Sequence, residues 1–182
     1  MNKKIFFGAV VLVLVLVAGG FFYWWQNQAD VRALNKTLPA GVRVAKSLIG
    51  NEYRVVNKID GYDFKIPPEM ANLKEVKYYE EEESNGMSLE GLGGDFLGVG
   101  VYKINATNID LEPWVDNWMG KFKTFSWIKE KDQIGDFEVI KLEESEHLAG
   151  LFGYFFKKSS KIYSINSISE DFIRYIISNG KW

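Results

Sequence analysis

The sequence predicts an α+β protein, in which an N-terminal transmembrane helix precedes one antiparallel β-sheet domain flanked by helices. Three observations predict this class. Residues 5–25 carry no charge, short segments of alternating apolar and polar residues follow between turn signals, and two later segments place apolar residues at helical spacing. Of the 182 residues, 157 follow the apolar segment, which is enough for one domain with a single core.

Residues 5–25 are expected to form an uncleaved signal-anchor. The segment runs from Ile5 to Trp25 and would span about 31 Å as a helix, close to the roughly 30 Å hydrocarbon core of a bilayer. Lys3 and Lys4 precede it, so residues 1–4 are predicted to stay in the cytoplasm and the C-terminal domain to lie outside the cell membrane. Trp24 and Trp25 close the segment at the outer interface, which makes the lipid bilayer an expected partner.

Three other interpretations of this segment remain open. A cleaved signal peptide fits the basic start, but cleavage near Val17-Ala18-Gly19 would leave an exposed aromatic N-terminus. The alternation of Val and Leu over Val10–Val17 permits a strand, although the flanking apolar residues extend the run past strand length. A pilin-type leader requires an early Glu, and no acidic residue lies between Met1 and Gln28.

The next elements are a stalk over residues 26–40 and then a domain over residues 41–182. The polar segment before Pro39-Ala40-Gly41 predicts a short helix or stalk. Asp60-Gly61 and Asn85-Gly86 are both expected to form hairpin turns. The glycines of residues 91–100 are expected to mark a bulge or close packing in a central strand that continues to Ile104. The strands expected in this half are Val42–Ile49, Glu52–Ile59, a strand over Tyr62, Phe64 and Ile66, and one on each side of Asn85-Gly86.

Two helices and four strands are expected in the second half. Asp110 is the predicted N-cap of a helix over residues 111–122, whose buried face would hold Leu111, Trp114, Val115, Trp118 and Phe122. Ser169 is the predicted N-cap of a final helix that ends at Asn179-Gly180. The strands between the helices are expected over residues 125–131 and 136–142, around Gly135, and over residues 148–156 and 161–168.

Three sequence segments resemble the PsbP/Mog-like superfamily, over about residues 60–177. They are Gly61-Tyr62-Asp63-Phe64-Lys65-Ile66-Pro67, then Val99-Gly100-Val101-Tyr102 with Leu111-Glu112-Pro113-Trp114-Val115, and finally Gly153-Tyr154-Phe155-Phe156 with Lys161-Ile162-Tyr163-Ser164-Ile165. The resemblance implies an antiparallel sheet sandwiched by helices, an α/β/α arrangement, and it implies no catalytic residue. The hairpin over residues 42–59 precedes the family's usual opening strand, which leaves its place in the sheet open.

Composition excludes several kinds of chemistry. Residues 26–182 carry 20 basic and 24 acidic side chains, and an acidic domain without a basic stripe is not expected to bind nucleic acid. The chain has no Cys, which excludes thiol catalysis, disulfides and Cys-based zinc sites. The glycines of residues 91–100 match neither a P-loop nor a dinucleotide fingerprint. We therefore expect no cofactor.

Two acidic clusters could in principle bind a cation. Glu143, Glu144, Glu146 and His147 would need a shared helical face, and they are expected to form a solvated loop between strands instead. Glu80–Glu83 lack the spacing of a Ca²⁺ loop and predict a charged hairpin face. His147 is the only His, and no nucleophile elbow accompanies it, so a serine triad is not expected.

Trp114, Trp118 and Trp127 form the most suggestive group of candidate binding residues. They could line an aromatic groove for a sugar or peptide, or Trp114 and Trp118 could be core residues of their helix. The leading hypothesis is a non-enzymatic, membrane-anchored extracytoplasmic protein that docks on, or helps to assemble, an unidentified protein partner at the cell surface. A small-ligand binding module with an aromatic groove is the first alternative, and a carboxylate- or metal-dependent enzyme is the second.

Overall fold

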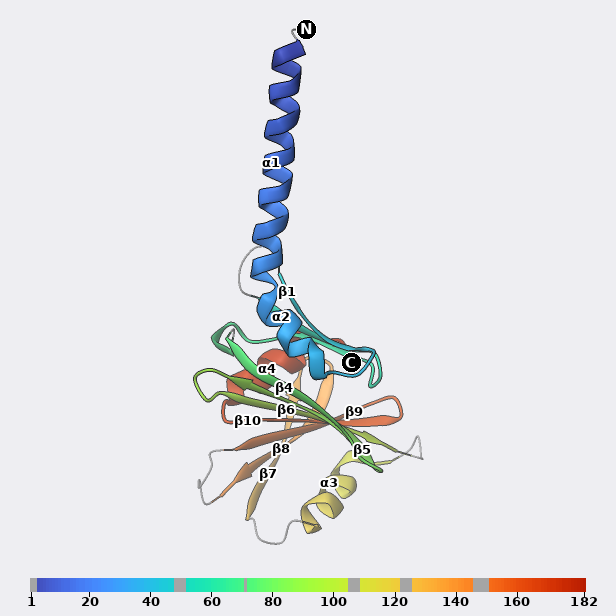
Figure 1. Cartoon of the computed structure of the whole chain (residues 1–182). Coiled ribbons are helices and arrows are strands. Elements are labelled where there is room, and N and C mark those ends of the chain that lie inside the picture. Colours follow the sequence, from blue (N-terminus) through green and yellow to red (C-terminus); the bar gives the residue numbers. More distant parts are fainter. Residues whose placement is uncertain (1–2, 48–51, 71, 105–108, 122–125, 146–150) are drawn as a thin grey trace.

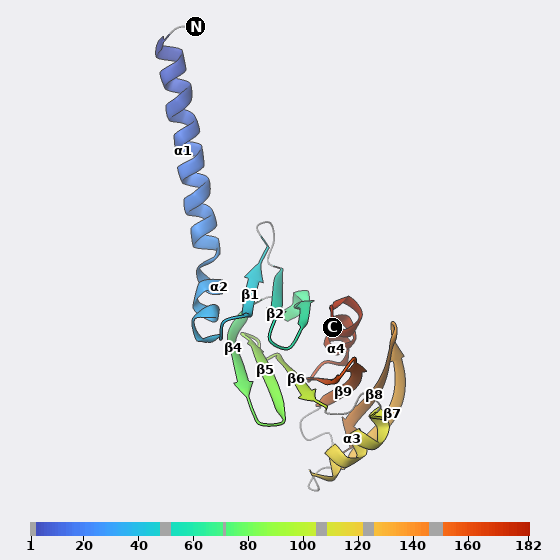
Figure 2. The same cartoon turned by 90° about the vertical axis from the view of Figure 1, so that its right-hand side faces the viewer.

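The computed structural model describes residues 3–47, 52–70, 72–104, 109–121, 126–145 and 151–182 (Figure 1). It contains an N-terminal apolar helix, two antiparallel sheets and a few further helices, which confirms the α+β class. The helix, α1, spans Lys3–Asn27 and projects away from the folded domain (Figures 1 and 2). Its length and composition suit a membrane anchor or a signal sequence.

The segment predicted as a stalk packs on the domain. It forms helix α2 (Ala29–Leu34) and a 3₁₀ turn, η1 (Asn35–Thr37). It buries Val31 and Leu34 in the larger of the two hydrophobic cores of the domain, called the main core below. The side-chain amide of Asn35 donates to the backbone carbonyl of Val44 at 2.8 Å, and its oxygen accepts from the backbone N–H of Val44 at 2.7 Å. Asn35 therefore pairs with the backbone N–H and C=O of Val44 at the outer edge of strand β1, where these groups have no strand partner.

Three strands after α2 form a small sheet of their own. They are β1 (Val42–Lys46), β2 (Tyr53–Asn57) and β3 (Tyr62–Lys65), in the order β1-β2-β3. The expectation of one sheet is therefore wrong, and the place of the early hairpin is settled: it pairs with β3 instead of joining the larger sheet. The free edge of β3 is covered by the C-terminal segment, because Asp63 and Lys181 exchange backbone hydrogen bonds of 2.9 and 2.7 Å.

The larger sheet has seven antiparallel strands in the order β4-β5-β6-β10-β9-β8-β7. The 3₁₀ turn η2 (Pro68–Met70) leads into it. Strand β10 pairs with both β6 and β9, and so joins the two halves of the sheet. The strands are β4 (Leu73–Glu80), β5 (Ser84–Gly91), β6 (Phe96–Lys103), β7 (Trp127–Ile134), β8 (Phe137–Glu144), β9 (Phe152–Lys158) and β10 (Lys161–Ser167).

The turn between β4 and β5 differs from the prediction. Asn85-Gly86 lies inside β5, and the exposed residues Glu81–Glu83 form the connection instead. The side chain of Asn85 is buried, where it binds the carboxylate of Asp60 at 2.6 Å. This tertiary contact outweighs the local turn preference of an Asn-Gly pair. The glycines of residues 91–100 do not share one strand, because residues 92–95 connect β5 to β6; the predicted close packing is confirmed at Gly100, where a side chain would overlap the hydroxyl of Ser164 on β10.

Helices cover both faces of the large sheet. Helix α3 (Leu111–Gly120) packs on one face over a small core of Val115, Ile140, Leu142, Phe155 and Ile162. Helix α4 (Glu170–Asn179) and the small sheet cover the other face, over the main core. Both predicted N-caps are confirmed, since Asp110 accepts from the backbone of Glu112 and Ser169 from that of Phe172. The expected residue Phe122 lies outside the described part of the chain.

Candidate functional site

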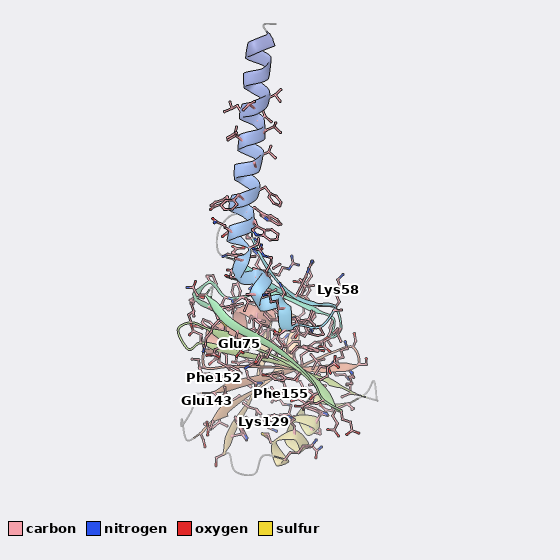
Figure 3. The ribbon with its side chains drawn as sticks, in the orientation of Figure 1. Lys58, Glu75, Lys129, Glu143, Phe152 and Phe155 are labelled. Atoms are coloured by element: carbon pink, nitrogen blue, oxygen red, sulfur yellow. The ribbon has the colours of Figure 1, made fainter. Side chains whose placement is uncertain are left out.

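A groove of about 860 Å³ lies where α3 meets the ends of β4, β5 and β6. The β4–β5 turn forms one wall, the end of β6 the floor, and α3 the other wall. This end of the domain is the one farthest from α1 in both cartoon views (Figures 1 and 2). Among the labelled side chains, Phe155 and Lys129 lie toward the α3 end and Lys58 toward the α1 end (Figure 3). The groove and the apolar helix therefore occupy opposite ends of the protein.

Three aromatic side chains line the groove. Trp114 and Trp118 are four residues apart and so share one face of α3, while Val115 points directly at the sheet and is fully buried. Tyr102 comes from β6, where it faces α3 because side chains alternate across a strand. The rings of Tyr102 and Trp114 are 4.9 Å apart, centroid to centroid. All three side chains are half-buried, so each both packs on the domain and borders the groove.

Trp114 and Trp118 form the wall of the groove on α3, called the aromatic wall below, and contacts with the rest of the domain hold it in place. The indole N–H of Trp118 donates to the hydroxyl of Tyr102 at 3.1 Å, and its ring lies 4.9 Å from the buried ring of Phe155. Trp127, on β7, packs against Trp118 from behind, with ring centroids 6.5 Å apart. The structure thus brings all three predicted Trp residues together, but only Trp114 and Trp118 border the groove.

The opposite wall is acidic. Glu81, Glu82 and Glu83 line the groove from the β4–β5 turn, and all three are exposed, as the sequence predicts for a charged hairpin face. Glu83 pairs with Lys121 at the end of α3 over 3.2 Å, which connects the two walls. Lys103 is a second cation at the groove. The sequence does not indicate that Tyr102 and the acidic wall of Glu81–Glu83 lie beside α3. Tyr102 is 16 residues from its partner Trp118, and Glu83 is 38 residues from its partner Lys121.

A second polar cluster lies buried between the two sheets. The carboxylate of Asp60 accepts from Asn57 at 2.7 Å, from Asn85 at 2.6 Å and from the hydroxyl of Tyr78 at 2.9 Å. Its backbone carbonyl accepts from the ammonium of Lys161 at 2.6 Å. The sequence indicates only the turn at Asp60-Gly61, whereas the structure shows a carboxylate whose donors come from β2, β4 and β5. These bonds join the two sheets.

An ionic network fastens α4 to the large sheet. Glu170 accepts from Tyr154 at 2.5 Å, Lys141 at 3.0 Å and Arg174 at 3.0 Å. Burial alone would raise the pKa of Glu170, but these three hydrogen bonds outweigh burial and lower the pKa to about 2. Arg174 also pairs with Asp132 on β7. The network lies on the α4 side of the sheet, away from the groove on the α3 side.

Of the second acidic cluster considered in the sequence, Glu143, Glu144, Glu146 and His147, the described members Glu143 and Glu144 lie outside the groove lining described above. Glu143 and Glu144 lie in β8, so they have strand spacing, and the expectation of a loop at these two positions is wrong; Glu146 and His147 are outside the described residues. Glu144 is buried, although a solvated position was expected. Within the described ranges, no group of three or more His, Asp or Glu side chains could hold a metal ion.

The junction between α1 and the domain is built from specific contacts. The guanidinium of Arg32 on α2 lies 3.8 Å from the ring centre of Trp25, and Trp24 is partly exposed beside it. Asp30 accepts from the ammonium of Lys46 at 2.9 Å and from the hydroxyl of Tyr53. Burial opposes the charge on Asp30, but these hydrogen bonds prevail and lower its pKa. The side chains of the predicted anchor residues Lys3, Lys4 and Ile5 lie outside the described part.

No family model matches the chain, and no curated protein matches it in sequence. The candidate site is therefore defined by its geometry.

Proposed function

We propose that the chain is a non-enzymatic, single-pass membrane protein whose extracytoplasmic domain docks on a protein partner at the cell surface through the groove. The observation that carries the proposal is the position of the half-buried aromatic wall at the end of the domain opposite α1. A binding surface at that end faces away from the bilayer that α1 would occupy. Partners in the extracytoplasmic space could then reach it.

The direction of insertion follows from charge. Lys3 and Lys4 precede the apolar segment, and positively charged flanks stay in the cytoplasm. Trp24 and Trp25 then lie at the outer interface, where the contact between Arg32 and Trp25 connects the anchor to α2. In the proposed topology the domain lies outside the cell.

The composition of the groove supports protein docking over catalysis. Trp and Tyr are enriched among the residues that dominate interface energies, since they bury a large apolar area while their N–H or O–H still forms a hydrogen bond. Among the described residues, the buried acids Asp60 and Glu144 are both absent from the groove lining, and the carboxylate of Asp60 binds the amides of Asn57 and Asn85 and a tyrosine hydroxyl. The carboxylates that border the groove, Glu81–Glu83, are exposed on a turn.

The packing of α3 on the sheet also supports the proposed PsbP/Mog-like relationship. The segment Leu111-Glu112-Pro113-Trp114-Val115 forms the first turns of α3, and Val99-Gly100-Val101-Tyr102 lies in β6. In this proposal α2, β1 and β2 are additions that join the domain to its anchor, whereas β3 belongs to the segment Gly61–Pro67 that carries part of the resemblance.

A saccharide is the second candidate ligand. Aromatic rings beside carboxylates and the amide of Asn117 offer stacking surfaces and hydrogen-bond partners for sugar hydroxyls. We rank it below protein docking because Trp114 and Trp118 pack against the domain and have only part of each ring available at the groove.

Site-specific photocrosslinking in intact cells tests the docking proposal. A photoreactive residue replaces Asn117, which is exposed in the groove, and in a matched control it replaces Asp136, which is exposed in the β7–β8 turn. We expect a discrete protein adduct from position 117 and none from position 136. Equal adducts from both positions, or none from position 117, would contradict docking through the groove, and retention on an oligosaccharide matrix without a protein adduct would favour the second candidate.

A further inference from the structure

We propose that the groove binds a basic segment of its partner protein, whose Arg or Lys side chains lie between the aromatic wall and the acidic turn. This inference rests on the proposed docking function and adds the chemistry of the partner. Three features of the groove lead to it: the charge of its surroundings, the aromatic rings of α3 and β6, and the exposed ion pair that connects its two walls.

Charge is unevenly distributed along the chain. Residues 26–70, which form α2 and the small sheet, hold 7 basic and 5 acidic side chains, whereas residues 71–182 hold 13 basic and 19 acidic ones. The part that carries the groove is therefore strongly acidic, while the part next to α1 is slightly basic. Such a net charge favours a cationic partner for the part of the chain that carries the groove.

The two walls of the groove also offer a cation favourable contacts at short range. Glu81 and Glu82 are exposed on one wall, and the rings of Trp114 and Trp118 border the other. A guanidinium between them could stack on an indole ring while its N–H groups bind a carboxylate, because Arg combines a flat cation with directional donors. The chain already contains the stacking half of this arrangement, where the guanidinium of Arg32 lies over the ring of Trp25.

The two cations of the groove do not neutralise it. Lys121 is paired with Glu83, and both side chains are largely exposed, with 57% and 80% of their surface accessible. An exposed pair of this kind contributes little stability, so an incoming cation can replace Lys121 on Glu83 at small cost. Lys103 lies at the end of β6, so the described lining residues carry three carboxylates and two ammonium groups, an excess of one negative charge.

Peptide binding to the full chain tests the inference. The protein is placed in nanodiscs of phosphatidylcholine, a lipid without net charge. Calorimetry then measures the heat as a short peptide of alternating Arg and Gly is titrated in. Matched peptides replace every Arg by citrulline, a neutral analogue of the same shape, or by Glu, and empty nanodiscs control for lipid binding. We expect the Arg peptide alone to bind, with an affinity that falls as salt is added.

Two double variants locate the interaction. Glu81→Gln with Glu82→Gln removes two of the three carboxylates of the groove and should weaken binding by roughly twofold to thirtyfold, the range expected for two exposed charge pairs. Glu69→Gln with Glu138→Gln makes the same change in net charge at exposed positions outside the groove, and should change affinity less than about twofold.

Three results would overturn the inference. They are equal binding of the citrulline peptide, equal effects of the two double variants, and no binding of the Arg peptide. If the crosslink from position 117 is still found in any of these cases, docking through the groove stands and only the basic character of the partner is rejected. Loss of that crosslink as well would reject the proposed function itself.

Discussion

The buried carboxylate of Asp60 should be one of the most sensitive positions in the domain. It accepts hydrogen bonds from Asn57, Asn85 and Tyr78, and these residues belong to both sheets. Replacing Asp60 by Ala removes three hydrogen bonds at once: the buried amides of Asn57 and Asn85 and the half-buried hydroxyl of Tyr78 each lose this acceptor. We therefore expect the small sheet to be held less tightly to the large one.

The expected loss in the free energy of unfolding can be worked out from these contacts. A hydrogen bond to a charged group contributes about 1.5–3 kcal/mol, and removing one partner of a buried charged network costs about 3–5 kcal/mol in total. Asp60→Ala should thus lower the free energy of unfolding by about 3–5 kcal/mol. Asp60→Asn keeps the shape but turns an amide donor toward other donors, so it should cost less, about 1–3 kcal/mol.

Urea unfolding of the full chain in detergent micelles, followed by Trp fluorescence, measures these values. Asp63→Ala is the matched control, because Asp63 lies on the neighbouring strand β3 and pairs with the exposed Arg54. Such a pair contributes at most about 1 kcal/mol. A loss for Asp60→Ala no larger than that for Asp63→Ala would refute the view that the buried cluster joins the sheets.

Three further predictions concern the rest of the domain. The pKa of Glu170 is about 2 in the folded protein and near 4.5 in the unfolded chain, so ionised Glu170 stabilises the fold above about pH 4.5, and this stabilisation is lost as the pH falls toward 2. Glu170→Gln should therefore lower the free energy of unfolding by about 1–2 kcal/mol near pH 7, and by less in urea melts at about pH 3. A fragment of residues 28–182 should be more stable than one of residues 40–182 by about 2 kcal/mol, since only the longer one retains Val31, Leu34 and the Asn35 bonds to β1, and equal urea midpoints would contradict this. Trp118→Ala should cost about 2–3 kcal/mol, less than the roughly 3–5 kcal/mol of a fully buried Trp, because Trp118 is half-buried; a loss below about 1 kcal/mol would show that the ring serves only the groove.

Local features of the fold could be predicted because they depend on neighbouring residues. Asp110 and Ser169 cap their helices through contacts two or three residues away, and alternation identified most strands. The division into two sheets could not be predicted, since strand partners are chosen by tertiary packing. The turn at Asn85-Gly86 was predicted wrongly for the same reason: the amide of Asn85 is held in β5 by Asp60, 25 residues away.

The candidate site was predictable only in part. Helical spacing places Trp114 and Trp118 together on one face of α3, and this is the aromatic wall that the structure shows. The sequence does not indicate that Tyr102 lies beside them or that Glu81–Glu83 oppose them, because these contacts arise when β6 and the β4–β5 turn come together with α3.

The proposed function requires a groove that lies outside the cell and is open to partners at the end of the domain opposite α1. The chain has no Cys, so single Cys substitutions report accessibility directly. With a membrane-impermeant maleimide on intact cells, we expect Asn117→Cys in the groove to be labelled, the fully buried Val115→Cys to remain unlabelled, and Asn2→Cys to react only after permeabilisation. If Asn117→Cys reacts only after permeabilisation, while Asn2→Cys reacts in intact cells, the domain lies in the cytoplasm and the proposed function is wrong.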